Sequence, residues 1–250
     1  MSLLRRRLVV FLPACVVLAA VLGWGLVQLP GFGLPHSDYA RYLAEHAPAQ
    51  RHASNVVATV VFDYRGWDTA GEELIMFAAV TGTALLLRAH REEGGKPKVD
   101  EVTSETLRSV APLAVALALV VGLWTIAFGY ITPGGGFQGG VVAASAALLA
   151  WLAGSYRRYR RVTPVPLVDS AEGAGAAGYL AVGLLGLAAG TGYLDNVLPL
   201  GSRGELASTG TIAVLNAATG LEIAAACVLI FHEFLEEYIR TLPADDQDDG

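Results

Sequence analysis

The sequence predicts an all-α fold, a polytopic membrane helical bundle of about six transmembrane helices with both ends in the cytoplasm. Hydrophobic residues make up 54% of the chain and charged residues 16%, with a mean hydropathy of +0.49. The apolar residues fall in runs that match the roughly 20 residues needed for a spanning helix. Arginines and lysines gather in alternate connecting segments, as expected for a chain that crosses a membrane repeatedly.

The elements follow from these runs. The apolar runs are residues 8–29, 72–87, 110–130, 137–155, 173–193 and 211–234. The second run is short and amphipathic at its start. We therefore expect residues 55–62, which precede it, as a further membrane-embedded piece.

Positive charges test the number of spans independently. With the N-terminus inside, the inner segments hold Arg5, Arg6, Arg7, Arg88, Arg91, Lys96, Lys98, Arg108, Arg157, Arg158, Arg160, Arg161 and Arg240. The outer segments hold only Arg41, Arg51, Arg65 and Arg203. This asymmetry fits six spans, and an odd number would break it.

The first apolar run has two interpretations. Arg5 to Arg7 form a basic region ahead of an apolar stretch, which is also the pattern of a cleaved signal peptide. The stretch runs unbroken to Leu29, longer than the apolar part of most signal peptides, and no clear small-x-small cleavage site follows it. An uncleaved first span is therefore favoured.

Composition divides the chain into modules. The polar stretch 92–106 is expected to be a cytoplasmic linker between a two-helix module at 1–91 and a four-helix module at 107–238. Residues 239–250 form an acidic C-terminal tail, which holds part of the net charge of -6. The acidity thus describes a solvated end, and no nucleic-acid partner is indicated.

The chain lacks the usual signatures of cofactor chemistry. Cys15 and Cys227 lie in separate apolar segments, without a second cysteine or a histidine at metal-ligand spacing, so we expect buried thiols and no metal site. No catalytic nucleophile, redox motif or nucleotide-binding loop is recognised. The sequence predicts no cofactor and no enzymatic activity.

A charged cluster precedes the second span. Its members are Asp63, Arg65, Asp68 and Glu72. One interpretation is an interfacial turn in which Arg65 pairs with Asp63 or Asp68, aromatic residues anchor at the headgroups, and Glu72 caps the helix. The other is a buried polar contact with a neighbouring subunit, or the mouth of an ion path.

A glycine-rich segment joins the third and fourth spans. This glycine junction, residues 130–142, contains Thr132, Pro133, Gly134, Gly135, Gly136, Gln138, Gly139 and Gly140. Irregular backbone at membrane depth persists only when it is buried in protein or lines water. Small residues at spacing four predict close helix packing, which is favoured over an anion-binding nest because no P-loop lysine is present. Gln138 is the one side chain there suited to lining a polar cavity.

Ionisable residues inside spans are the sharpest functional signal, because a charge at bilayer depth costs at least about 2.5 kcal/mol. Glu222 lies near the centre of the last span, and helical spacing puts Asn216 and Thr219 on its face. It is a candidate for a proton relay or for a structural carboxyl group that fixes helix register. Glu172, at the start of the fifth span, is a second candidate.

The inner end of the last span carries His232, Glu233, Glu236 and Glu237. A solvated boundary is the favoured interpretation for this group, since long polar side chains at span ends reach toward water.

Two segments resemble known families. Ile131-Thr-Pro-Gly-Gly-Gly-Phe-Gln-Gly-Gly-Val-Val142 is similar to the hallmark of the MnhB domain, the MnhB subunit of multisubunit Na+/H+ antiporters of the Mrp or Mnh type. The likeness extends over about residues 108–238. Residues 55–72 resemble the Val-Asp-Phe-Arg-Gly-Phe-Asp-Thr-x-Gly-Glu pattern at the C-terminal end of the large antiporter subunit and in the small membrane subunit of membrane-bound hydrogenases, with Tyr64 and Trp67 in place of two phenylalanines.

The resemblance implies a fusion of two modules in a non-catalytic, multi-pass subunit of the plasma membrane. Its partners would be the other membrane subunits of the complex, the lipid bilayer, protons, and Na+ or another monovalent cation. Glu222 and Glu172 become candidates for a proton path or an interface. Two alternatives remain, an ion-translocating subunit in the membrane arm of a respiratory hydrogenase-type complex, and a stand-alone structural or channel protein.

Overall fold

The computed structural model describes residues 3–29, 38–91 and 104–241, and in these ranges the only regular elements are helices. The chain divides into two compact units, residues 1–42 and 43–250. The first holds α1 (Leu3–Val27), in which Pro13 lies inside the helix. The linker predicted at 92–106 and the tail predicted at 239–250 fall largely outside the described residues.

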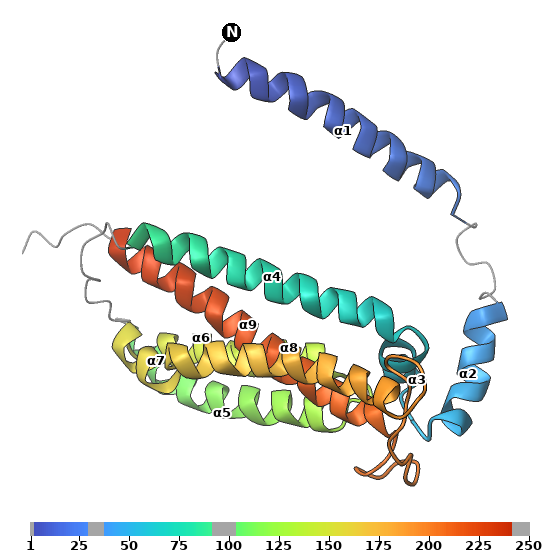
Figure 1. Ribbon diagram of the computed structural model, residues 1–250. Coiled ribbons are helices and arrows are strands. Elements are labelled where there is room, and N and C mark those ends of the chain that lie inside the picture. Colours follow the sequence, from blue (N-terminus) through green and yellow to red (C-terminus); the bar gives the residue numbers. More distant parts are fainter. Residues whose placement is uncertain (1–2, 30–37, 92–103, 242–250) are drawn as a thin grey trace, which may run out of the picture. The chain divides into compact units, whose positions relative to one another are not determined.

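The second unit is a helical bundle (Figure 1). Its elements are the end of α2 (Asp38–Gln50), α3 (Val56–Thr59), a π-helical turn η1 (Val60–Tyr64), α4 (Gly66–Arg91), α5 (Glu105–Ala127), α6 (Gly136–Leu152), α7 (Tyr156–Val162), α8 (Val165–Ala188) and α9 (Thr211–Thr241). The all-α prediction is confirmed.

Four helices among the described residues are long and apolar enough to cross a membrane. They are Gly66–Ala89, Glu105–Ala127, Val165–Ala188 and Thr211–Ile239, and two shorter apolar helices are Phe11–Val27 and Gly136–Leu152. Each predicted run thus corresponds to one helix. The cytoplasmic placement of both ends remains a prediction.

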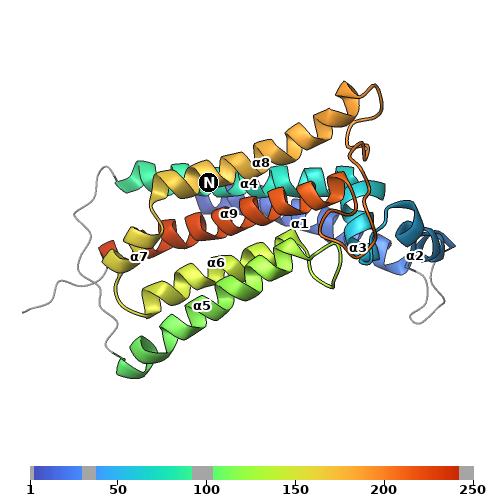
Figure 2. The same ribbon diagram turned by 90° about the horizontal axis from the view of Figure 1, so that it is seen from below.

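Helix α9 is the centre of the bundle. It contacts α4, α5, α6 and α8, while α5 packs chiefly on α6 (Figures 1 and 2). Its inward side chains Ile212, Leu215, Ile223 and Leu229 are almost fully buried. Any polar residue on this face of α9 is therefore enclosed by neighbouring helices and not by lipid.

Helices α4 and α8 begin well before the spans predicted for them. The fifth span was expected from residue 173, but α8 starts at Val165, after Pro164, because proline is compatible with the first turn of a helix. The second span was expected from residue 72, whereas α4 starts at Gly66. Both shifts carry acidic residues into helix interiors.

The embedded piece predicted before the second span is α3 with η1, which contact α4 and α9. Asn55 caps this segment, accepting from the backbone N–H of Val57 at 3.0 Å. Its Nδ2 also donates to the carbonyl of Gly129 at 2.6 Å. The side chain thereby ties the broken helix to the glycine junction.

Glycines bring the helices at the junction close together. A Cβ on Gly140 would lie 2.9 Å from the carbonyl oxygen of Gly220 on α9, and a Cβ on Gly139 would lie 2.7 Å from the carbonyl oxygen of Gly122 on α5. Real Cβ atoms essentially never come this close to such atoms. Side chains at either position would force α6 away from its neighbours.

Candidate functional site

Glu222 lies on the buried face of α9 with 0% of the residue exposed. Neither of its carboxylate oxygens has a hydrogen-bond partner among the described residues. The carboxyl groups of Glu73 on α4 and Glu172 on α8 are near enough to interact with it electrostatically. Three carboxyl groups from three helices therefore converge inside the bundle, an arrangement that is costly unless protons or a cation compensate it.

Glu73 is the member of this group that sequence reasoning missed. It is 3% exposed and faces Glu222 and Thr219, although no contact among the three has the geometry of a hydrogen bond within the described structure. Glu72, which was selected instead, is exposed and does not cap α4, because the helix begins at Gly66. Helical spacing was the signal that could have identified Glu73, because it places Glu73 on the same face of α4 as Thr69 and Val80. All three residues are buried.

A glycine on α8 makes room for the convergence. A Cβ on Gly175 would lie 2.5 Å from the backbone nitrogen of Glu222 and 2.6 Å from its Cβ. Helices α8 and α9 therefore touch backbone to backbone beside the carboxylate. Glu172, 5% exposed, lies one turn earlier on α8, well inside the helix and not at its start as predicted.

A first cavity opens beside Glu73. We call it the junction cavity; it measures about 280 Å³ and is lined by residues of α3, η1, α4, the glycine junction and α9. Its polar lining includes Thr69, Glu72, Glu73, Gln138 and Thr219. Gln138, which was predicted to line a polar cavity, does so.

A second cavity opens beside Glu172. This arginine cavity, about 240 Å³, is lined by the polar residues Thr81, Arg88, Asp169 and Glu172 and by apolar residues of α4, α8 and α9. Glu222 lines neither cavity. It lies within electrostatic range of one carboxyl group from each cavity lining, Glu73 in the first and Glu172 in the second.

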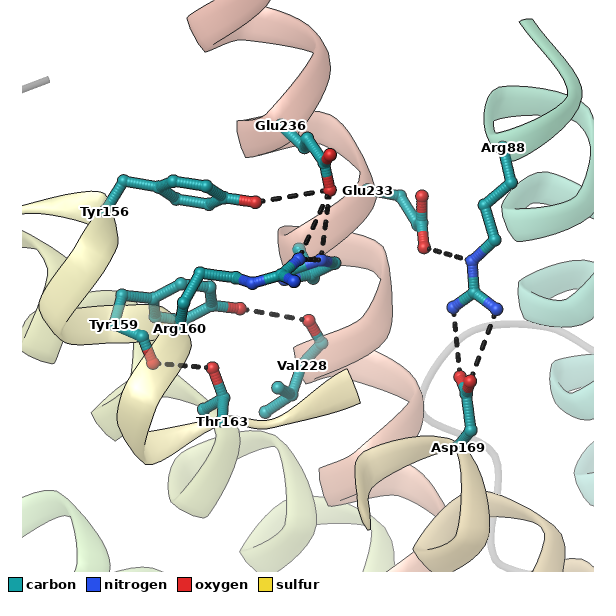
Figure 3. Close-up of polar contacts among 10 residues, drawn as sticks. Arg88, Tyr156, Tyr159, Arg160, Thr163, Asp169, Val228, Glu233 and Glu236 are labelled. Carbon is teal, nitrogen blue, oxygen red and sulfur yellow. Dashed lines mark hydrogen bonds and ion pairs between the residues drawn. The ribbon is translucent and has the colours of Figure 1, made fainter. Parts of the chain in front are cut away.

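Arg88 joins three helices at the arginine cavity (Figure 3). Its Nε lies 2.8 Å from Glu233 on α9, and its terminal nitrogens lie 3.0 and 3.2 Å from the two oxygens of Asp169 on α8. Glu233 is 1% exposed. The solvated boundary predicted for Glu233 is therefore wrong, because Arg88 neutralises the carboxylate inside the protein.

His232 is also buried, contrary to the prediction. It is enclosed by α7, where the rings of Tyr156 and Tyr159 stack near its imidazole. Its Nε2 lies 2.7 Å from Arg160 Nη1 and 3.3 Å from Glu236 Oε2. Burial raises the pKa of Tyr156 and of Tyr159 to about 12, so both phenols stay protonated at neutral pH.

The charged cluster at 63–72 is divided by the structure. Asp63 accepts from Arg51 Nε at 2.7 Å and from Asn196 at 3.2 Å, and is nearly buried. Arg65 pairs with Asp68 at the surface. Of the two partners predicted for Arg65, the structure shows Asp68. Asp63 instead belongs to a separate contact, which joins η1 to Asn196 in the loop before α9.

Asn216 has a structural contact. Its Oδ1 accepts from the backbone N–H of Gly136 at 2.7 Å and its Nδ2 donates to Ile126 at 2.6 Å. It therefore caps α6 from a neighbouring helix. Thr219 lies one turn later and faces Glu73, so the two residues predicted to share a face with Glu222 sit in different surroundings.

The rest of the junction is partly exposed. Gly135, Gly136, Gly139 and Gly140 are buried, Thr132 and Gly134 are half-buried, and Pro133 and Gln138 are exposed. Within the described ranges, no three His, Cys, Asp or Glu side chains are placed to hold a metal ion. Cys15 and Cys227 are free thiols, each half-buried.

A known protein family matches just under half of the chain. A family described as a domain related to the MnhB subunit of Na+/H+ antiporters matches residues 106–229. An uncharacterized protein of Methanocaldococcus jannaschii is 31% identical over 196 residues, which cover 68% of this chain and 73% of that protein. The chain belongs to the MnhB-related family.

Two solved structures are similar to nearly all of the chain. A chain of the membrane-bound sulfane sulfur reductase, an archaeal respiratory membrane complex, is 31% identical with a TM-score of 0.71, covering 94% of this chain and 99% of that one. A chain of the Mrp complex from a Dietzia species has a TM-score of 0.68 at 22% identity, and the match covers 100% of this chain but 27% of that one. The second likeness shows a shared fold.

Both solved relatives are parts of multisubunit membrane complexes. Together with the family match and the apolar helices, they identify this chain as a multi-pass membrane protein.

Proposed function

We propose that this chain is a non-catalytic subunit of a multisubunit antiporter in the plasma membrane, where the complex exchanges protons for Na+ or another monovalent cation. The family and the Mrp likeness support the class of complex. The observation that carries a direct role in transport is Glu222, a fully buried carboxyl group within electrostatic range of Glu73 and Glu172, which line two different cavities.

The proposed relay uses three carboxyl groups. A proton taken up from the junction cavity by Glu73 passes to Glu222 and then to Glu172, which lines the arginine cavity. Arg88 holds Asp169 and Glu233 in ion pairs, so we place these two carboxyl groups outside the relay. Buried carboxyl groups of this kind mark ion and proton pathways in membrane proteins.

The module assignment is part of the same proposal. We propose that residues 1–91 correspond to the C-terminal end of the large antiporter subunit and residues 107–238 to the MnhB subunit. Both modules contribute carboxyl groups to the relay, because Glu73 belongs to the first module and Glu172 and Glu222 belong to the second.

Everted membrane vesicles test the function. Cells expressing the full gene cluster are compared with cells lacking only this gene, and Na+-dependent proton exchange is followed with a fluorescent pH probe. We expect exchange with the full cluster and loss of it without this chain. Unchanged exchange in the deletion strain, with the remaining complex intact, contradicts a direct role.

A second candidate is an ion-translocating subunit in the membrane arm of a respiratory complex. The match to the sulfane sulfur reductase chain favours it, because that chain aligns along almost its whole length at 31% identity. Purification of the native complex separates the two functions. Co-purified subunits with Cys-x-x-Cys pairs and bound iron favour the respiratory complex, whereas their absence favours the antiporter.

A further inference from the structure

The junction cavity holds buried oxygen atoms whose hydrogen-bonding capacity is unused. Glu73 Oε2 and Thr219 Oγ1 are buried, line the cavity, and have no hydrogen-bond partner within the described part of the chain. The two residues are 3% and 1% exposed. Such orphaned polar atoms are rare in folded proteins and call for a ligand.

The charge of the cavity defines the ligand. Its lining contains two carboxyl groups, Glu72 and Glu73, and among its lining residues there is no lysine, arginine or histidine. Glu222 adds a third carboxyl group behind Glu73. Arg88, which lies farther along α4, is held by Asp169 and Glu233 at the other cavity. An anion is therefore repelled and a cation attracted.

The ligand atoms and the available room favour a monovalent ion. All the polar side chains offer hard oxygen atoms, a carboxylate, a hydroxyl and the Gln138 amide, whose Oε1 lies beside Gly135. No three acidic or soft side chains in the described residues are placed to hold one metal ion, as a divalent or transition metal site would favour. A volume of about 280 Å³ admits a cation with several waters, since one water takes roughly 30 Å³ of liquid.

We propose that the junction cavity is a binding site for Na+ or a similar monovalent cation, with Glu73 as its charged ligand and Thr219 and Gln138 as neutral ligands. This inference rests on the proposed function, because it locates the binding of the exchanged cation. Glu73 would thus hold either a proton or the cation, and exchange between the two occurs where the relay begins.

Carbodiimide labelling tests the site without relying on transport. Dicyclohexylcarbodiimide reacts with protonated carboxyl groups in apolar surroundings, and mass spectrometry locates the adduct. The purified complex is labelled in Na+ or in choline at equal ionic strength. At Na+ about tenfold above its dissociation constant, we expect about tenfold less adduct on Glu73.

Three variants test which residues bind the cation. Glu222→Gln leaves Glu73 as the buried carboxyl group at this site, and protection of Glu73 by Na+ should persist. Thr219→Val removes a neutral ligand and should shift protection to higher Na+. Thr83→Val is the matched control, because this α4 hydroxyl bonds within its own helix, to Ala79, and does not line the cavity. It should leave protection unchanged.

Labelling of Glu73 that is independent of Na+, or absent in choline, overturns the site. If the wild-type complex still exchanges Na+ for protons in vesicles, the proposed function stands and the cation binds elsewhere. If exchange itself is absent while Na+ protects Glu73, the proposed function fails and the cation site remains.

Discussion

Gly175 is the residue of α8 that packs against the backbone of Glu222. We expect Gly175→Leu to push α8 from α9, because even a Cβ would lie 2.5 Å from the Glu222 backbone nitrogen. Overpacking of this kind costs about 1–3 kcal/mol or more. The melting temperature of the purified complex should fall, and exchange activity should fall with it.

Gly173→Leu is the control on the same helix. A Cβ at Gly173 meets nothing within 4 Å. If both variants lowered the melting temperature equally, the close approach at Gly175 would not be the cause.

Asn216 should prove structural and not part of the relay. Asn216→Ala leaves the buried Gly136 N–H without its acceptor, which costs about 1–3 kcal/mol. Asn216→Asp keeps an oxygen at that position, so its melting temperature should lie between those of wild type and the alanine variant. Normal stability of Asn216→Ala with lost exchange would instead assign Asn216 to the ion path.

At the residue scale, Glu222 was predictable and its partner was not. A carboxylate in the middle of a long apolar run stands out without any structure. Glu73 adjoins Glu72, and choosing between them requires the phase of α4, which depends on where the helix begins. The predicted start at residue 72 hid this phase, whereas the observed start at Gly66 puts Glu73 on the side of Thr69 and Val80.

At the element scale, Arg88 holds α4 against α8 and α9. Arg88→Ala removes the bidentate ion pair with Asp169 and the ion pair with Glu233. Glu233 is only 1% exposed. Breaking a buried pair costs about 3–5 kcal/mol, and the 39% exposure of the Arg88 side chain reduces this to about 1–3 kcal/mol. The melting temperature of the complex should fall.

Arg88→Lys should restore little of that stability, because an ammonium group lacks the planar fork that contacts both carboxylates. Arg158→Ala, an exposed arginine of α7, serves as the control and should leave the melting temperature unchanged. Full rescue by lysine would show that charge alone holds the three helices.

The helices themselves were predictable from apolar runs, but their ends were not. The fifth span was predicted to start at residue 173, which is after Asp169 and directly after Glu172. In the structure both residues lie within α8, where Asp169 pairs with Arg88 and Glu172 lies within electrostatic range of Glu222. The groups that interact with Asp169 and Glu172 lie on other helices, and the spacing of residues along one helix does not reveal such partners.

At the scale of the whole molecule, the direction of the chain across the membrane follows from its positive charges alone. We expect Arg158→Cys to face the cytoplasm and Ser202→Cys, in the exposed loop before α9, to face the opposite side. Both are made after Cys15 and Cys227 are replaced by alanine. In intact cells, a membrane-impermeant maleimide should label only Ser202→Cys, and in everted vesicles only Arg158→Cys; the reverse pattern contradicts the predicted orientation.

The central claim is that Glu222 passes protons between two cavities. The most direct measurement is Na+-dependent proton exchange in everted vesicles that carry the assembled complex with Glu222→Gln or Glu222→Asp. Glutamine matches the shape of the side chain and cannot ionise, whereas aspartate keeps the carboxyl group. We predict exchange at the background level for glutamine and partial exchange for aspartate, with normal assembly of both. Unchanged exchange with Glu222→Gln in an intact complex would contradict the relay and make Glu222 a structural carboxyl group.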